Sequence, residues 1–142
     1  MGLTLGWLPV QLAIALAGLA FGVAEYLILT PQPLIAELTW QQIWLPALIF
    51  LVCTGFVEEF IFRGVLQRTA VEVFGWWWGI IYVSLLFAVL HMGFLSWIDV
   101  IFVLAVALFF GWVVKKTGSL FGVTLAHGIT NSLLYLVVPF FL

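Results

Sequence analysis

Five apolar stretches, most of them about as long as a membrane is thick, dominate the amino-acid sequence. They cover approximately residues 5–29, 44–75, 76–92, 98–116 and 120–138. A helix that crosses the ~30 Å hydrocarbon core of a bilayer needs about 20 mostly apolar residues. Membrane strands would instead alternate apolar and polar residues over ~10 positions, and these stretches show no such alternation. We therefore predict an all-α fold, a polytopic membrane bundle of about five transmembrane helices.

The composition excludes several other classes of protein. Charged residues make up 7% of the chain and hydrophobic residues 66%, which leaves too few charges to coat a soluble globular core. The formal net charge is -2 and the basic residues are scattered, so we expect no nucleic-acid partner. The single cysteine, Cys53, excludes a disulfide framework and a multi-thiolate metal site. We expect membrane lipid around the protein, and residues 1–142 form a single predicted transmembrane domain.

Basic residues near the helix ends indicate the orientation in the membrane. If the helices alternate in direction, Arg68, Lys115 and Lys116 fall on the same side as the N-terminus. The opposite side holds Glu37 and Asp99 and has no Lys or Arg. The positive-inside rule then predicts a cytoplasmic N-terminus and a C-terminus on the opposite side. No basic segment precedes the first stretch, so we expect this stretch to be a retained span rather than a cleaved signal.

Charged residues in the middle of the second stretch, GFVEEFIFRG, are the most unusual feature of the sequence. A charge at the centre of a span costs roughly 2.5–3.5 kcal/mol, so Glu58, Glu59 and Arg63 are expected to face protein or a water-filled cavity. Glu59 and Arg63 lie four residues apart on one helix face and can pair, which is a purely structural explanation for both. Glu58 points about 100° away and is not explained by that pair. Glu25 is less unusual, because it lies near the outer end of the first stretch and could reach the interface.

The two histidines also lie within apolar stretches. His91 ends the sequence FAVLH, and His127 begins HGITN, in which Asn131 shares its helix face. A structural explanation for each histidine alone is a hydrogen bond between helices. Because Glu58, His91, His127 and Asn131 come from three different stretches, we expect these four side chains to surround one polar cavity inside the membrane.

Two kinds of water activation fit this set of residues. Glu58 could act as a general base toward water, a histidine could orient that water, and the Asn131 amide could donate to a developing oxyanion. Alternatively, Glu58, His91 and His127 could hold a zinc ion with one position open for water, although the HExxH motif is absent. Both schemes lead to hydrolysis, most naturally of a peptide bond.

Three short motifs occur in order, one in each of three separate stretches. EEFIFR, FAVLH and HGITN resemble the EExxxR, FxxxH and HxxxN/D motifs of the CAAX protease and bacteriocin-processing family, also called CPBP or Abi. This family consists of multi-pass intramembrane endopeptidases and includes the type II CAAX prenyl proteases. The resemblance covers roughly residues 45–138, the predicted catalytic core, and leaves a single span before it where relatives often have several.

The resemblance implies a role for each matched position. Glu58 and His91 would activate the water molecule, and His127 and Asn131 would stabilise the oxyanion. The supporting residues would be Glu59, Arg63 and Phe87. Members of the family have been described both as metalloproteases and as metal-independent glutamate proteases, so zinc stays possible. We favour a metal-free site because Asn131 is a poor zinc ligand and a sensible oxyanion donor.

The resemblance also implies a substrate class. The family acts on membrane-associated peptides, and in the type II CAAX prenyl endopeptidases the substrate is a prenylated CAAX-type protein. We therefore expect an intramembrane endopeptidase. The alternative is a non-catalytic membrane protein of the same fold, such as an immunity or scaffold protein.

Overall fold

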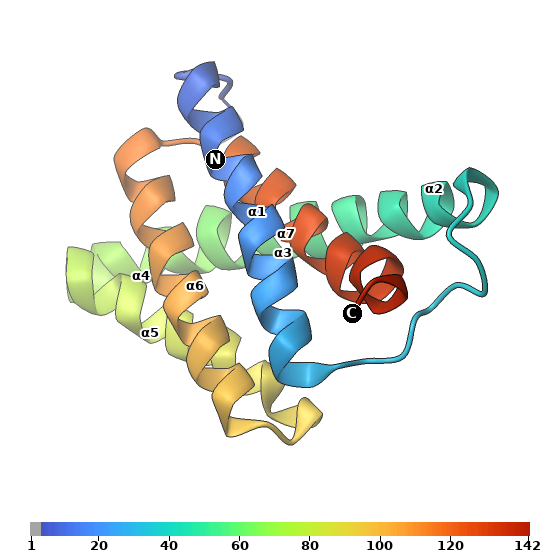
Figure 1. The fold of residues 1–142 in the computed structure, drawn as a ribbon. Helices are drawn as coiled ribbons and strands as arrows, with labels where there is room; N and C mark the ends of the chain where they lie inside the picture. Colours follow the sequence, from blue (N-terminus) through green and yellow to red (C-terminus); the bar gives the residue numbers. More distant parts are fainter. Residues whose placement is uncertain (1–3) are drawn as a thin grey trace.

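The computed structural model describes residues 4–142, and within them the chain forms five helical rods (Figure 1). An extended connection joins the first rod to the second, and the other connections are short. Each rod is long and apolar enough to cross a membrane. The five rods are Leu8–Leu29, Trp40–Phe74, Trp76–Phe94, Trp97–Thr117 and Phe121–Phe140. No strand occurs among residues 4–142. The predicted all-α class and the predicted number of spans are confirmed.

Four of the rods are wholly or mainly regular α-helices. Helices α1 (Leu8–Leu29) and α6 (Trp97–Thr117) are continuous. Helix α5 (Trp76–Val89) tightens into a 3₁₀ segment, Leu90–Phe94, at its end. Helix α7 (Phe121–Ser132) continues as a π-helical segment, Leu133–Val137, and a short 3₁₀ turn, Val138–Phe140.

The second rod is irregular, and it carries the unusual charges. Helix α2 (Trp40–Ile49), the short helix α3 (Val57–Glu59) and helix α4 (Gln67–Phe74) are joined by two π-helical segments, Phe50–Phe56 and Phe60–Leu66. π-Helical turns are rare and frequently occur at functional sites. The rod has 35 residues, about 50 Å at the rise of an α-helix, which is longer than a bilayer core is thick. In Figure 1 it runs behind α1 and α6, across their direction.

Local sequence explains where the helices begin and end. The hydroxyl of Ser96 accepts a hydrogen bond from the Asp99 backbone N–H and so caps the start of α6. Gly118, with φ of 67°, ends α6 in the left-handed conformation that glycine tolerates. The second rod begins at Trp40, four residues before the predicted start. Its early start is stabilised by Gln42, whose side-chain oxygen accepts from the backbone N–H groups of the two preceding connection residues Ala36 and Glu37.

Helix α7 lies at the centre of the bundle, and the helices on both sides approach it very closely. On one side, a Cβ atom at Gly18 of α1 would clash with the backbone of Ala126. On the other side, a Cβ atom at Gly55 would lie 2.7 Å from the carbonyl oxygen of Thr124. Small residues at such crossings let membrane helices approach at backbone distance. These contacts fix the position of the helix that carries His127 and Asn131.

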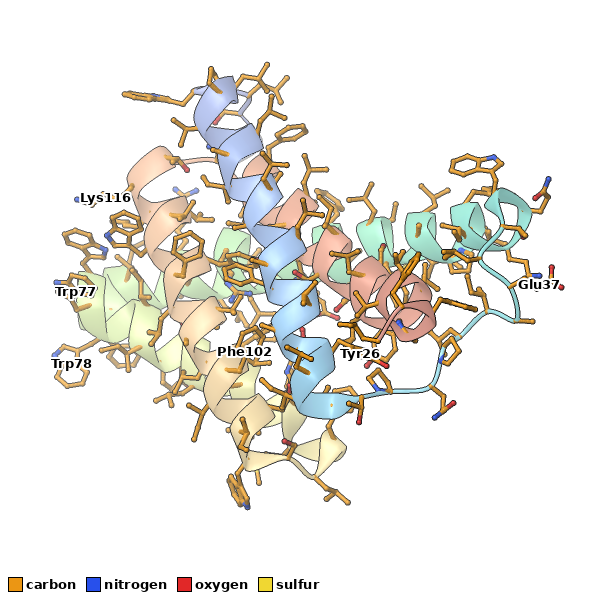
Figure 2. The ribbon with its side chains drawn as sticks, in the orientation of Figure 1. Tyr26, Glu37, Trp77, Trp78, Phe102 and Lys116 are labelled. Carbon is orange, nitrogen blue, oxygen red and sulfur yellow. The ribbon has the colours of Figure 1, made fainter. Side chains whose placement is uncertain are left out.

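One end of the bundle combines basic and aromatic residues. Trp77 and Trp78 project outward from the start of α5, and Lys116 lies close to them at the end of α6 (Figure 2). The Lys116 ammonium lies 4.8 Å from the centre of the Trp76 ring. Tryptophan and basic residues commonly occupy the membrane interface. Glu37 lies on a distant part of the molecule, in the connection between α1 and α2 (Figure 2).

Candidate active site

Glu59 forms the centre of a buried polar network. Its Oε1 atom accepts a hydrogen bond from Arg63 Nη1 at 3.0 Å and lies 2.8 Å from His127 Nδ1. The predicted pairing of Glu59 with Arg63 is confirmed, and both side chains are almost completely buried. The same carboxylate therefore ties the second rod to α7.

The contact with Glu59 assigns a proton to His127. A carboxylate only accepts hydrogen bonds, so Nδ1 of His127 is the donor in this pair; the tautomer follows from the hydrogen-bond network. The opposite ring nitrogen, Nε2, lies 3.9 Å from Oε2 of Glu58. That distance is too long for a hydrogen bond. Nε2 is thus left free between Glu58 and the interior of the bundle.

Phe87 supports the network through its ring face. The Arg63 guanidinium carbon lies 4.5 Å from the centre of the Phe87 ring, within the range of a cation–π interaction. Arg63 also donates through Nη2 to the backbone carbonyl of Ala107 at 3.4 Å. The rings of His91 and His127 lie 5.2 and 5.8 Å from the Phe87 ring. Phe87 therefore contacts three of the predicted site residues, and its supporting role stays a prediction.

A small cavity of about 30 Å³ lies beside these residues. Its polar lining consists of Glu25, Arg63, His91, His127, Thr130 and Asn131. Phenylalanine and valine side chains complete its wall. A cavity of this size has room for water, which requires two to four polar partners. The arrangement can therefore hold a water molecule against two imidazoles and an amide.

His91 and Asn131 are each anchored by one hydrogen bond and keep another group free. His91 Nδ1 lies 3.2 Å from the carbonyl oxygen of Phe87, so Nδ1 is the donor and Nε2 is an open acceptor. Asn131 donates through Nδ2 to the Thr54 hydroxyl at 2.9 Å, and Thr54 donates to the Phe50 carbonyl at 2.6 Å. One N–H and the side-chain carbonyl of Asn131 remain for a ligand.

The structure brings three of the four predicted catalytic residues to one cavity. His91, His127 and Asn131 line it, whereas Glu58 does not. The Glu58 side chain is 36% exposed and reaches the site through its approach to His127. Within residues 4–142 no hydrogen bond or ion pair joins Glu58 to His91. The predicted catalytic roles of all four residues stay predictions.

Glu25 corrects an expectation. Its place near the end of the first stretch allows an interfacial carboxyl, but Glu25 is only 6% exposed and lines the cavity. The reason is the close packing of α1 on α7, which turns the face carrying Gly18, Gly22 and Glu25 inward. These positions are four and three residues apart, the spacing of one helix face. In the sequence, this spacing is the feature that indicates an inward position for Glu25.

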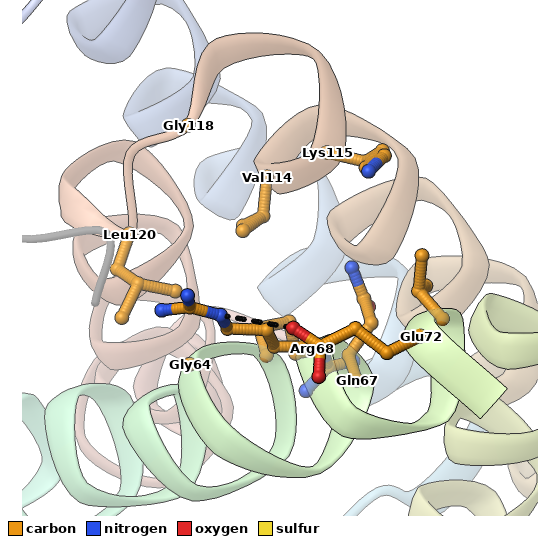
Figure 3. A pocket seen from close by; sticks show the side chains of 10 residues that line it. Gly64, Gln67, Arg68, Glu72, Val114, Lys115, Gly118 and Leu120 are labelled. Atoms are coloured by element: carbon orange, nitrogen blue, oxygen red, sulfur yellow. Dashed lines mark ion pairs between the residues drawn. The ribbon is translucent and has the colours of Figure 1, made fainter. Parts of the chain in front are cut away.

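A second, larger cavity of about 330 Å³ opens between α4 and the end of α6 (Figure 3). Arg68, Glu72 and Lys115 lie along it, and Arg63 borders both cavities. Arg68 and Glu72 form an ion pair at 3.5 Å, with both side chains 66% exposed. Such exposed pairs contribute little to stability. Apart from Arg63, this cavity contains none of the predicted site residues.

The residues as placed do not assemble a metal site. Among residues 4–142, no three His, Cys, Asp or Glu side chains are grouped closely enough to hold a metal ion. The proposed zinc ligands Glu58, His91 and His127 are therefore not gathered around one point. The preference for a metal-free site, with zinc as the alternative, stays a prediction.

Fold and site together define a polytopic membrane protein with a polar site enclosed between its helices. A family model described as type II CAAX prenyl endopeptidase Rce1-like matches residues 39–133, and the chain belongs to this family. The match spans the three motifs from Glu58 to Asn131 and confirms the predicted family.

One curated relative is similar over most of the same region. The uncharacterized protein YpbD of Bacillus subtilis (strain 168) is 39% identical over 90 residues, which are 62% of this chain and 43% of YpbD. The chain thus spans less than half the length of this relative. No solved structure matches the chain.

Proposed function

We propose that the chain is an intramembrane endopeptidase that hydrolyses a peptide bond of a membrane-associated substrate by attack of water. The observation that carries this proposal is the water-sized cavity within the bundle, where His91 and His127 each have one ring nitrogen anchored and the other free. Membership of the type II CAAX prenyl endopeptidase Rce1-like family supports the same reaction class.

In the first step, His91 acts as the general base toward water, and Glu58 supports this step through its negative charge. The open Nε2 of His91 takes a proton from water, and the water oxygen attacks the carbonyl carbon of the substrate. Glu58, 3.9 Å from His127, balances the positive charge that a doubly protonated His127 ring carries. A positioned general base typically contributes 10²–10⁴-fold to a rate.

In the tetrahedral intermediate, the negative oxygen needs donors. The free N–H of Asn131 is one donor, and Nε2–H of His127 is the other when both ring nitrogens carry protons. Glu59 holds His127 through Nδ1 in the orientation that this role requires. When the intermediate collapses, the carbon–nitrogen bond breaks and the proton taken by the base passes to the leaving amine. One oxyanion donor contributes about 10²–10³-fold.

The proposed substrate class is a prenylated CAAX-type protein or peptide, because the matched family is described by that activity. The lipid chain of such a substrate would lie in the bilayer, and its peptide end would reach the cavity between the helices. The apolar helices would surround the lipid chain, and the polar residues around His127 would surround the peptide end.

Purified protein in liposomes, incubated with a fluorogenic prenylated CAAX peptide, tests the proposal. We expect cleavage by the wild-type chain and loss of cleavage in Glu58→Gln, which keeps the size of the side chain and removes its negative charge. Glu37→Gln, on the exposed connection between α1 and α2, is the matched control and should cleave normally. A Glu58→Gln variant with wild-type cleavage would contradict the mechanism, and a wild-type chain that cleaves no peptide would favour the non-catalytic alternative.

A further inference from the structure

Glu25 is a buried carboxyl group that the mechanism above does not use. It lies on α1, outside the residues 39–133 that match the family model, and none of the three motifs includes it. Only 6% of the residue is exposed, and its side chain makes no hydrogen bond or ion pair within residues 4–142. A carboxyl group in this position therefore requires an explanation of its own.

Burial of an unpartnered carboxyl group within a membrane span is costly, and such residues usually face a bundle interior or a water-filled cavity and serve a function. Glu25 fits this pattern, because it lines the cavity of about 30 Å³ together with His91, His127 and Asn131. The partner that Glu25 lacks in the protein is expected to be the occupant of that cavity.

The free groups around the cavity indicate what the occupant is. His91 Nε2 is an acceptor because its Nδ1 donates to the Phe87 carbonyl. Asn131 offers one N–H and its carbonyl, since its other N–H donates to Thr54. Glu25 adds further acceptor oxygens. A ligand that both donates and accepts hydrogen bonds, and that is as small as the cavity, is water.

We propose that Glu25 is a further catalytic residue, which binds and orients the attacking water molecule together with His91. The inference rests on the proposed function. One O–H of the water donates to the Glu25 carboxylate and the other to His91 Nε2, and the water oxygen then faces the substrate carbonyl. On attack the new carbon–oxygen bond forms and the second proton passes to His91. Glu25 keeps its hydrogen bond to the oxygen that was the water, so it directs the attack without becoming bonded to the substrate.

The kinetic test compares three variants of the full chain in liposomes. Glu25→Gln is expected to lower kcat at least 30-fold with KM within threefold of wild type, because the amide orients water poorly but leaves substrate contacts intact. Glu25→Asp keeps the carboxyl group one methylene shorter and should recover part of the loss, even if Glu25→Gln folds poorly. Glu37→Gln should match wild type. A Glu25→Gln variant with kcat within threefold of wild type would overturn the inference.

A second measurement does not depend on activity. A structure at a resolution that shows ordered water should place one water molecule within about 3.2 Å of both a Glu25 carboxyl oxygen and His91 Nε2. A dry cavity, or a water bound without Glu25, would overturn the inference. If the water is present but the wild-type chain cleaves nothing, the proposed function fails and the water site stands. If Glu58→Gln is inactive and Glu25→Gln is normal, the inference fails and the proposed function stands.

Discussion

The Nδ1 atom of His127 lies 2.8 Å from the Oε1 atom of Glu59, so the central helix α7 and the irregular second rod fix each other through one buried contact. Glu59 also accepts from Arg63, which balances its charge. The two adjacent acids consequently differ in their surroundings. Glu59 is enclosed and contacts Arg63 and His127 through Oε1, whereas Glu58 is partly exposed and has no hydrogen-bond partner among residues 4–142. This difference favours a structural role for Glu59 and a chemical role for Glu58.

The two Glu–Arg pairs at four-residue spacing provide a matched comparison of stability. Glu59→Gln leaves Arg63 buried without its counter-charge, and removal of one partner of a buried pair costs about 3–5 kcal/mol. Glu72→Gln breaks the exposed pair with Arg68 and should cost about 0–1 kcal/mol. The free energy of unfolding in detergent micelles checks both values. Equal losses from the two substitutions would contradict the assignment of Glu59 to the buried network.

Thr54 is expected to act as a positioning residue for Asn131. Thr54→Val keeps the shape of the side chain and removes the hydroxyl that accepts from Asn131 Nδ2. A typical hydrogen bond contributes ~0.5–1.5 kcal/mol, so kcat should fall roughly 2- to 10-fold while KM is unchanged. Thr69→Val removes an exposed hydroxyl that bonds only to its own helix, and it serves as the control. A change in KM with normal kcat would argue against this role.

The close crossing of α1 and α7 should be sensitive to a single methyl group. Gly18→Ala places a Cβ atom against the backbone of Ala126 and forces the helix that carries His127 to move. Overpacking of this kind costs about 1–3 kcal/mol, and cleavage should fall with it. Gly93→Ala is the control: a Cβ atom there meets nothing within 4 Å, so neither stability nor cleavage should change. Normal stability and activity of Gly18→Ala would contradict the packing described for α1.

Cleavage is expected to survive the removal of metal ions. Zinc chelators should leave the rate with a prenylated peptide unchanged, because the proposed steps require only water and side chains. The control is a zinc peptidase treated in the same way. Loss of activity on chelation that zinc restores would show that Glu58, His91 and His127 come together around a metal during the reaction.

The charge distribution predicts the orientation of the protein. Arg68, Lys115 and Lys116 should face the cytoplasm, which places the C-terminal end of this chain on the opposite side of the membrane. A reporter active only outside the cytoplasm, fused after Leu142, should be active, and the same reporter before Met1 should be silent. The reverse pattern would contradict the positive-inside assignment.

Features that depend on neighbouring residues in the chain could be predicted from the sequence. The five spans are continuous apolar runs, and Glu59 and Arg63 pair because four residues bring them to one helix face. The sequence predicts a start near Trp44 for the second rod, but the rod begins at Trp40. The apolar pattern does not show this, because the first turn contains polar residues and the Gln42 side chain accepts hydrogen bonds from the connection before it.

Features that depend on how helices are rotated against each other could not be derived in this way. His127 contacts Glu59 at 2.8 Å and approaches Glu58 only to 3.9 Å. These two acids lie on the short helix α3 between two π-helical segments, whose irregular turns a regular helical spacing does not predict. The inward position of Glu25 follows from the crossing of α1 with α7. Its spacing from Gly18 and Gly22 marks a common face, but only the packing shows that this face meets the cavity.

Hydrolysis in water enriched in oxygen-18 tests the central claim most directly. The wild-type chain in liposomes should cleave a prenylated CAAX peptide, and mass spectrometry of the fragment with the new C-terminus should find one oxygen-18 atom in its carboxylate. Glu58→Gln should yield no such fragment. Absence of any labelled fragment from the wild-type chain, or the same amount from Glu58→Gln, would contradict the account of water attack at this site.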